Sequence, residues 1–297
     1  MRILYINSLD HSGSTVLDMA LGCHSNMIGL GEVAQILNAD KKDLLDHPDY
    51  NEVFCSCGQP VNECEFWKKA RQTLAGDQGS QTTQRYQMLI DHFAQTYGND
   101  MILVDSSKNP NDYLLEINEK HDLRVIFLVR DVRSWIYSRH SRLGTNTLKL
   151  AYQWFKRNLK ILWFLKKNNL HYRTFGYEEI ALYPEEMLRQ ICEYVGVGYD
   201  PAMLIPDNTK SHVFNGNVAK GDKQKRKGFL YDGRWLTSLS LVWLGPLIFP
   251  LLVWNRKLVY SNFMRGRTRA FGKSQQDFLI FGDARKEQLV KEKWGIK

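Results

Sequence analysis

The sequence predicts an α/β fold in which a parallel β-sheet is flanked by helices. Two observations lead to this fold class: short apolar runs alternate with segments of helical periodicity, and each run is followed by a polar turn. The chain has 297 residues, of which 43% are hydrophobic and 24% are charged. This composition is that of an ordinary globular protein, and it excludes collagen, wholesale disorder and a polytopic membrane protein.

The expected elements follow one another as strand, loop and helix. The N-terminal run Arg-Ile-Leu-Tyr-Ile-Asn is the first strand, and a helix is expected behind the Ser-rich loop that follows it. Pro184 can open one of the later helices. The predicted strands span 2–7, 101–104, 124–129 and 171–175, and the predicted helices span 15–21, 148–167 and 184–195.

We expect one domain over residues 1–235 and a basic C-terminal region over 236–297. Residues 39–84 are rich in Asp, Gly, Gln and Ser, and are interpreted as an irregular insertion lying over the sheet. Residues 208–233 are polar and basic, which is typical of a mobile loop. Positive charge gathers late in the chain, since residues 215–297 hold 17 Lys and Arg against 6 Asp and Glu.

The loop Ser8–Thr15 between the first strand and helix is suited to binding an anion. Backbone N–H groups at a helix N-terminus, with a Gly that lets them converge, form a cradle for phosphate oxygens. Compared with the nucleotide triphosphate loop Gly-x-x-x-x-Gly-Lys-Ser/Thr, Ser8 replaces the first Gly and Ser14 replaces the Lys. Because that Lys reaches the β and γ phosphates, a shorter 5' anion fits better than ATP. The alternative is an ordinary Ser or Thr helix cap.

His11-Ser12-Gly13-Ser14-Thr15 resembles the 5'-phosphosulfate loop of the sulfotransferases that use 3'-phosphoadenosine 5'-phosphosulfate. The family loop reads Lys or Arg, then Ser-Gly, then two residues that are Ser or Thr, so four of five positions match. His11 is the departure, because its unperturbed pKa of about 6.5 leaves it only partly charged at neutral pH. Contact with a multiply charged anion should raise that pKa.

The resemblance also implies a 3'-phosphate site made by an Arg at a strand end and a Ser eight residues later. Arg130 and Ser138 match this spacing. A guanidinium and a hydroxyl two helical turns into the next helix can close on one phosphate from two sides. The family's cofactor-closing loop contains Arg-Lys-Gly, which Arg226-Lys227-Gly228 resembles, although a solvated charge run explains that basic match about as well.

A further match is the segment that begins at Asp105. Family members carry a Lys just past this strand that contacts the transferring group, and Lys108 is the matching residue. The alternative is a Walker-B-like Asp105 that holds magnesium, as in P-loop kinases. The segment from Phe175 to Ile180 resembles the family's Tyr-Glu-Asp-Leu segment and is taken as mainly structural.

The resemblance implies a sulfotransferase fold and transfer of a sulfuryl group to a hydroxyl or amine. Ser12, His11 and Lys108 are candidates to stabilise the leaving phosphate, and no metal is expected to be required. Glu32 matches a Gly-Glu position where some sulfotransferases place their catalytic carboxylate, so we favour it as the base and keep His11 as the alternative. Helix capping or acceptor binding is an equally simple role for Glu32.

Two other functions stay open from the sequence. A P-loop kinase or other phosphotransferase would consume ATP with magnesium, and the missing Lys at Ser14 argues against it. A catalytically silent, membrane-associated nucleotide-binding protein would bind the cofactor without turnover, and His11 keeps this possibility open. The acceptor, whether carbohydrate, lipid or small metabolite, depends on the insertion and the mobile loop.

Three cysteines, Cys55, Cys57 and Cys64, fall within ten residues. They could hold zinc with a fourth ligand such as His47, but their spacing differs from the paired Cys-x-x-Cys pattern. We expect a structural Cys-rich turn, and a similar segment followed by Phe-Trp, here Phe66-Trp67, recurs in bacterial sulfotransferases.

Residues 235–254 contain no charged side chain, yet Gly245, Pro246 and Pro250 interrupt the run. Two interpretations remain: a buried C-terminal helix, or a kinked segment lying in a membrane interface beside basic neighbours. The opening apolar stretch is too short for a secretory signal, so we expect a cytoplasmic protein with possible peripheral contact at the inner face of an anionic membrane. We expect no nucleic-acid partner.

Overall fold

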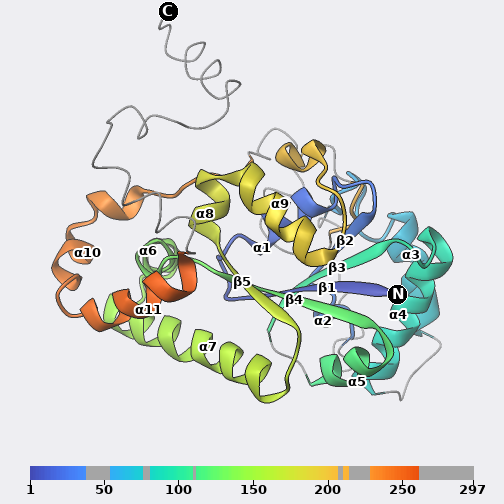
Figure 1. Cartoon of the computed structure of the whole chain (residues 1–297), viewed down its shortest axis with the longest axis horizontal. Coiled ribbons are helices and arrows are strands. Elements are labelled where there is room, and N and C mark those ends of the chain that lie inside the picture. Colours follow the sequence, from blue (N-terminus) through green and yellow to red (C-terminus); the bar gives the residue numbers. More distant parts are fainter. Residues whose placement is uncertain (38–53, 76–80, 110–111, 207–209, 214–227, 261–297) are drawn as a thin grey trace, which may run out of the picture.

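The computed structural model describes residues 1–37, 54–75, 81–109, 112–206, 210–213 and 228–260. Its centre is a parallel sheet of five strands in the order β2-β3-β1-β4-β5 (Figure 1). The strands are β1 (Arg2–Ser8), β2 (Met27–Gly31), β3 (Ile102–Lys108), β4 (Asp122–Val129) and β5 (Tyr172–Gly176). The predicted α/β class with a parallel sheet is therefore confirmed.

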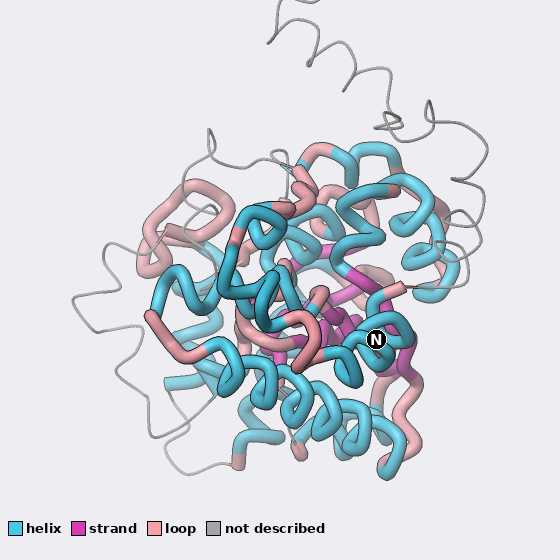
Figure 2. Tube along the Cα trace, turned by 90° about the vertical axis from the view of Figure 1, so that its left-hand side faces the viewer, coloured by secondary structure: helices cyan, strands magenta, loops and turns pink. Residues whose placement is uncertain are grey.

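Helices cover both faces of the sheet, because neighbouring strand residues point alternately into two hydrophobic cores. Leu4 and Ile6 of β1 face one core, which α1 and α9 cover. Ile3 and Tyr5 face the other core, to which α4, α5, α6 and α7 contribute. Figure 2 shows the helices surrounding the strands. The helices are α1 (Ser14–Leu21), α2 (Ala34–Leu37), α3 (Glu65–Ala75), α4 (Thr82–Tyr97), α5 (Tyr113–Lys120), α6 (Val132–Leu143), α7 (Thr147–Lys167), α8 (Tyr177–Leu182), α9 (Pro184–Val195), α10 (Leu239–Leu244) and α11 (Phe249–Val259).

The region expected to be an irregular insertion contains regular structure. The helix α3 lies within it, and α4 begins at its end. The apolar residues Phe66, Trp67, Ala70 and Leu74 of α3 are buried in the core that α4 shares. Their helical spacing explains why this polar stretch folds as a helix.

The uncharged C-terminal run forms two short helices. Gly245 and Pro246 lie between α10 and α11, as the helix-breaking residues of the sequence suggest. Among the described residues, the structure contains no helix that is both long and apolar enough to cross a membrane. Val259 of α11 packs so closely on β5 that a Cβ on Gly176 would lie 1.8 Å from its carbonyl oxygen.

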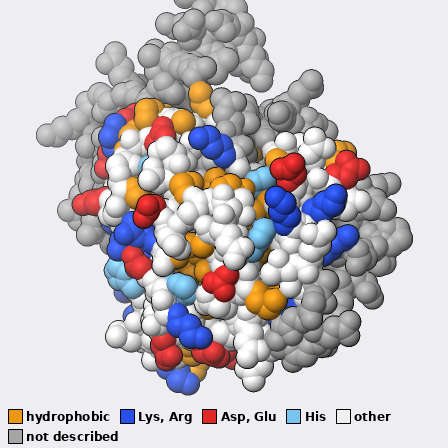
Figure 3. Space-filling view, turned by 90° about the vertical axis from the view of Figure 1, so that its right-hand side faces the viewer, with side chains coloured by type: hydrophobic (Ala, Val, Ile, Leu, Met, Phe, Trp, Pro, Cys, Tyr) orange, Lys and Arg blue, Asp and Glu red, His pale blue; other side chains and the backbone are white. Residues whose placement is uncertain are grey.

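The strand order places a topological switch between β1 and β4. From β1 the chain continues to β2 at one edge of the sheet, and from β4 it continues to β5 at the opposite edge. Open α/β sheets bind ligands at such a point, beyond the carboxyl ends of the strands. At the opposite edge, where the strands begin, Figure 3 shows acidic and basic side chains interspersed, with neither sign gathered into one patch.

Candidate active site

A cavity of about 440 Å³ opens at the carboxyl edge of the sheet. Each of the five strands delivers a residue to it, because every strand ends at this edge. These residues are His11 after β1, Glu32 after β2, Lys108 at the end of β3, Arg130 after β4 and Tyr177 after β5. The remaining lining residues are Asp10, Gly13, Ser14, Thr15, Val16, Ser138, Arg142, Asp232 and Arg234.

The anion loop has the expected form at the N-terminus of α1. Gly13 caps the helix with φ +88°, and a Cβ there would lie 2.3 Å from the ring of Tyr177. Glycine is therefore required by both the backbone and the neighbouring ring. Ser14 and Thr15 line the cavity, so the N-terminal end of the helix points at it. Ser12 does not line the cavity, and its backbone N–H donates to the Leu9 carbonyl at 3.2 Å.

Among the cavity residues other than glycine, His11 and Lys108 have a left-handed backbone conformation. Their φ angles are +64° and +71°. Such conformations are uncommon for residues other than glycine and cluster at functional sites. Burial lowers the pKa of His11, and the cations of Arg142 and Arg139 act in the same direction. His11 is therefore largely neutral at neutral pH in the ligand-free protein.

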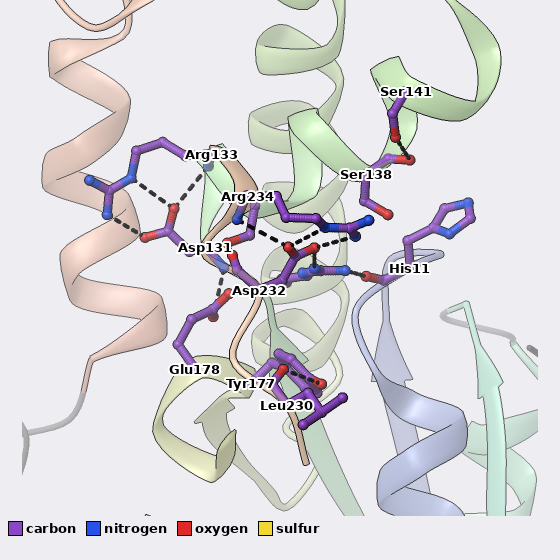
Figure 4. Close-up of polar contacts among 12 residues, drawn as sticks. His11, Asp131, Arg133, Ser138, Ser141, Tyr177, Glu178, Leu230, Asp232 and Arg234 are labelled. Atoms are coloured by element: carbon purple, nitrogen blue, oxygen red, sulfur yellow. Dashed lines mark hydrogen bonds and ion pairs between the residues drawn. The ribbon is translucent and has the colours of Figure 1, made fainter. Parts of the chain in front are cut away.

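Arg130 joins the anion loop to the second expected phosphate site. Its Nη1 donates to the carbonyl oxygen of His11 at 2.6 Å, and its guanidinium lies over the ring of Tyr177, 5.5 Å from the centroid. Ser138 of α6 lines the same cavity, on the side toward which His11 points (Figure 4). The structure thus brings the loop, Arg130 and Ser138 to one cavity.

A carboxylate occupies the cationic part of the cavity. Nη2 of Arg130 lies 2.8 Å from Oδ2 of Asp232, whose carboxylate also accepts from Arg234 at 2.8 and 2.9 Å (Figure 4). The hydrogen bonds from Arg234 lower the pKa of Asp232, and the charge of Arg130 adds to this effect. Two guanidinium groups around one anion are the geometry with which proteins bind phosphate.

Glu32 and Lys108 form an ion pair inside the cavity, and each side chain is 13% exposed. Gln35 donates to the other carboxylate oxygen of Glu32 at 2.6 Å. The backbone N–H of Ala34 donates to Oγ of Ser107 at 2.8 Å, which ties the segment after β2 to the end of β3. The two strand ends therefore hold Glu32 and Lys108 next to each other.

Asp105 does not line the cavity. It is completely buried, and its carboxylate accepts from the hydroxyl of Tyr86 at 2.9 Å and from the backbone N–H of Ser107 at 2.8 Å. Burial raises the pKa of Asp105 to about 7. A magnesium-binding carboxylate would face the phosphates, so this geometry does not favour the kinase alternative.

The basic loop expected to close over the cofactor falls largely outside the described residues, because Arg226 and Lys227 are among those not described. Gly228 is described, and it lies beside the carbonyl of Leu204 rather than at the cavity. Within the described part of this loop, Asp232 and Arg234 reach the cavity instead.

Several residues that line the cavity are not among those predicted from the sequence. Tyr177 lies in a segment expected to be mainly structural, and the others are Asp10, Arg142, Asp232 and Arg234. Burial alone would raise the pKa of Asp10, but the charges of Arg157, Lys108 and Arg139 bring it below its usual value. The run of basic residues after Arg130 was a signal for Arg142, whereas nothing local marked Asp232 or Arg234.

The fold and the site define an α/β protein in which a glycine-containing loop after the first strand leads into a helix whose N-terminal end faces the cavity. Its family follows from the sequence: the model of the sulfotransferase family matches residues 4–201, and the chain belongs to that family. No curated protein matches the chain.

Solved structures with a similar fold include several sulfotransferases. The sulfotransferase domain from the curacin biosynthetic pathway has a TM-score of 0.54 and 22% identity, covering 83% of this chain and 97% of that one. The sulfotransferase domain of the olefin synthase from Synechococcus PCC 7002 has a TM-score of 0.46 and 17% identity, covering 84% and 94%. A sulfotransferase from Alicyclobacillus acidocaldarius has a TM-score of 0.44 and 13% identity, covering 88% and 97%.

Proposed function

We propose that this sulfotransferase takes its sulfuryl group from 3'-phosphoadenosine 5'-phosphosulfate and transfers it to a hydroxyl or amine of a carbohydrate, lipid or small metabolite. The observation that carries the proposal is the single cavity shared by the anion loop, Arg130 and Ser138. A donor that carries phosphate groups on both the 3' and the 5' position of its ribose needs two anion sites in one cavity, and these residues supply them.

The donor would occupy the cavity with its 5' end at the loop. The N–H groups at the start of α1 and the hydroxyls of Ser14 and Thr15 would hold the phosphosulfate. The 3'-phosphate would take the place of the Asp232 carboxylate against Arg130, with Ser138 beside it. Among the described residues, four cationic side chains line this cavity, Lys108, Arg130, Arg142 and Arg234, which suits a multiply charged anion.

Transfer requires an acceptor atom to attack sulfur while the bond from sulfur to the leaving phosphate oxygen breaks. The acceptor's proton would pass to the carboxylate of Glu32, which lines the cavity. Charge that develops on the leaving phosphate would be stabilised by Lys108 and by the loop N–H groups. The products are the sulfated acceptor and 3',5'-adenosine bisphosphate. In this assignment, Lys108 both orients Glu32 and faces the reacting group.

Radiolabelled donor tests the proposal directly. The protein is incubated with donor labelled in its sulfuryl group and with sets of sugars, lipids, phenols and amines, and labelled products are separated. We expect labelled product together with one equivalent of 3',5'-adenosine bisphosphate, and no stimulation by magnesium. Magnesium-dependent transfer of label from the γ-phosphate of ATP would instead show a phosphotransferase. Donor binding without transfer to any acceptor would favour the silent binding protein.

We further propose peripheral contact between the C-terminal helices and an anionic membrane. The helices α10 and α11 and the turn between them bury one face, which includes Leu241, Leu244 and Ile248. The opposite face of these helices and the residues next to them expose large apolar side chains. Arg256 and Lys257 of α11 are exposed as well. These apolar residues are Leu236, Leu239, Leu247, Phe249, Val253 and Trp254. Apolar groups with basic neighbours are the features of an interfacial segment.

Sedimentation with liposomes tests this contact. The full chain should pellet with vesicles that contain phosphatidylserine and remain in solution with neutral vesicles. Phe249→Asp should reduce the pelleted fraction, whereas Ile205→Asp, which changes an apolar residue at 36% exposure outside this face, should not. A wild-type protein that stays in solution with both kinds of vesicle would contradict the proposal.

A further inference from the structure

Four potential metal ligands from two distant segments meet outside the cavity. Cys55, Cys57, Cys64 and His212 offer ligand atoms that all lie within 4.8 Å of one another. Sγ of Cys64 is 3.1 Å from Nδ1 of His212, and Sγ of Cys55 is 3.8 Å from the same nitrogen. His47, the fourth ligand suggested by the sequence, lies outside the described residues, and His212 lies beside the cysteines instead.

We propose that these four side chains bind one Zn²⁺ ion with tetrahedral geometry. Zinc bound to thiolate sulfur at about 2.3 Å and to imidazole nitrogen at about 2.0 Å gives ligand atoms roughly 3.5–3.8 Å apart. The distances of 3.1 and 3.8 Å from Nδ1 of His212 to the sulfurs of Cys64 and Cys55 differ from the lower of these values by only about 0.3–0.4 Å. A set of three thiolates and one imidazole is typical of structural zinc. The three thiols lose their protons on binding, and Nδ1 of His212 donates its lone pair.

The backbone around the cysteines has the form of a tight metal-binding turn. The N–H of Gly58 donates to the carbonyl of Cys55 at 2.9 Å, and the N–H of Cys55 donates to the carbonyl of Gln59 at 2.8 Å. Gly58 has φ +95°, which glycine adopts without strain. Cys64 directly precedes α3, so the start of that helix fixes its position.

His212 is oriented by groups that pack around it. The indole N–H of Trp67 donates to the backbone carbonyl of His212 at 2.7 Å. The ring of Phe66 stacks on its imidazole, with centroids 5.3 Å apart and an angle of 18° between planes. Phe66 and Trp67 follow Cys64 in the sequence, so the same helix that positions a thiol also positions the imidazole. Neighbours that fix a ligand's orientation are a regular feature of metal sites.

The site would join the Cys-rich segment to the edge of the sheet. The backbone N–H of His212 donates to the carbonyl of Gly29 at 2.8 Å, and the N–H of Gly29 donates to Oγ of Ser211 at 2.8 Å. Residues 211–213 therefore lie along the outer side of β2, the strand that leads to Glu32. Zinc would cross-link this edge to α3 and so support the end of the cavity that carries Glu32. This inference does not depend on which donor or acceptor the cavity binds.

Metal analysis of the purified full chain tests the proposal. We expect one zinc per chain by elemental mass spectrometry, released when a mercurial reagent modifies the thiols. Cys57 is the exposed ligand, so the Cys57→Ser variant should fold normally. Its zinc affinity should fall by more than about 100-fold, because loss of a residue that only supports a ligand already lowers metal affinity by about 10- to 100-fold. Cys192→Ser, which changes a buried thiol elsewhere in the fold, should keep the full zinc content.

Cobalt gives a second readout that does not depend on the variants. Titration of the metal-free wild-type protein with Co²⁺ should produce the intense visible bands of tetrahedral cobalt and a thiolate charge-transfer band, with saturation at one equivalent. Three results would each overturn the proposal. They are substoichiometric zinc with no cobalt bands, an intact mass lower by two hydrogens that reveals a disulfide among the three cysteines, or equal zinc affinity in Cys57→Ser and wild type.

Discussion

The carboxylate of Asp232 lies 2.8 Å from the guanidinium of Arg130, in the cavity that also contains the anion loop. Both side chains are largely shielded from solvent: that of Arg130 is 10% exposed and that of Asp232 is 13% exposed. The residue expected to bind the 3'-phosphate is therefore already paired with an anion from the C-terminal loop. A ligand phosphate at Arg130 has to displace this carboxylate or move it aside.

Replacing Asp232 with Asn should strengthen binding of 3',5'-adenosine bisphosphate. The substitution removes a competing negative charge while keeping the side-chain shape, and it frees both Arg130 and Arg234 for the ligand. We expect the dissociation constant to fall about tenfold, which corresponds to roughly 1.4 kcal/mol. Calorimetry measures it, with Asp91→Asn on the surface of α4 as control. Weaker binding would mean that Asp232 orients Arg130 for the ligand.

Binding of the bisphosphate should be accompanied by proton uptake at His11. Burial lowers the pKa of His11 in the free protein, so the ring is neutral there, and a nearby phosphate should raise that pKa. Affinity should then increase as pH falls through the pKa of the bound state, and level off below the lowered pKa of the free protein. Calorimetry in buffers of different ionisation enthalpy reports the protons taken up. His11→Asn, whose side chain tolerates the left-handed backbone, should abolish the uptake. Equal uptake in this variant would exclude His11.

Gly13→Ala should abolish donor binding and destabilise the protein by about 1–3 kcal/mol. The new Cβ would lie 2.3 Å from the Tyr177 ring, in a backbone conformation with φ +88°. Gly144→Ala is a matched control, because Gly144 also has a left-handed backbone, with φ +62°, but no heavy atom lies within 4 Å of the new Cβ. It should show a smaller loss of stability and unchanged binding. Thermal unfolding and calorimetry compare the two variants, and equal effects on binding would show that contact with Tyr177 is unimportant.

Glu32→Gln should abolish sulfuryl transfer and leave binding of 3',5'-adenosine bisphosphate intact. The amide keeps the size of the carboxylate and a hydrogen bond to Lys108, but it cannot take the acceptor's proton. Transfer from labelled donor is measured with any acceptor on which the wild type turns over. Glu193→Gln, on the exposed face of α9, serves as control. Near-normal transfer by Glu32→Gln would assign the base to another residue.

The parallel sheet and four of its strands could be predicted because their cause lies in local pattern, whereas β2 and the strand order were not predicted. Strands β1, β3 and β4 each contain a continuous apolar run, as expected for strands buried on both faces, whereas β5, at the edge of the sheet, includes Arg173 and Thr174. The helix α3 was missed because its buried side chains are spaced along a chain segment dominated by polar residues. Periodicity, rather than composition, identifies such a helix.

Most of the candidate site that could be predicted consists of residues that follow strand ends, together with Ser138 in the helix after Arg130. The loop at His11 and Gly13, Lys108 and Arg130 each lie at the end of a strand, where parallel topology brings them together. Asp232 and Arg234 reach the cavity from a loop far along the chain, and His212 reaches the cysteines in the same way. The positions of these three residues depend on how distant parts of the chain pack together, and such packing leaves no local signal in the sequence.

The central claim is that the anion loop and Arg130 bind one doubly phosphorylated adenosine. Calorimetry with 3',5'-adenosine bisphosphate and with ATP tests it most directly, on the wild type, Arg130→Ala and the surface control Arg189→Ala, with thermal unfolding to confirm that each is folded. We expect the wild type and the control to prefer the bisphosphate, and Arg130→Ala to bind it about 10- to 100-fold more weakly, since hydrogen bonds to charged groups contribute about 1.5–3 kcal/mol. A preference for ATP, or unchanged affinity in a folded Arg130→Ala protein, would contradict the account.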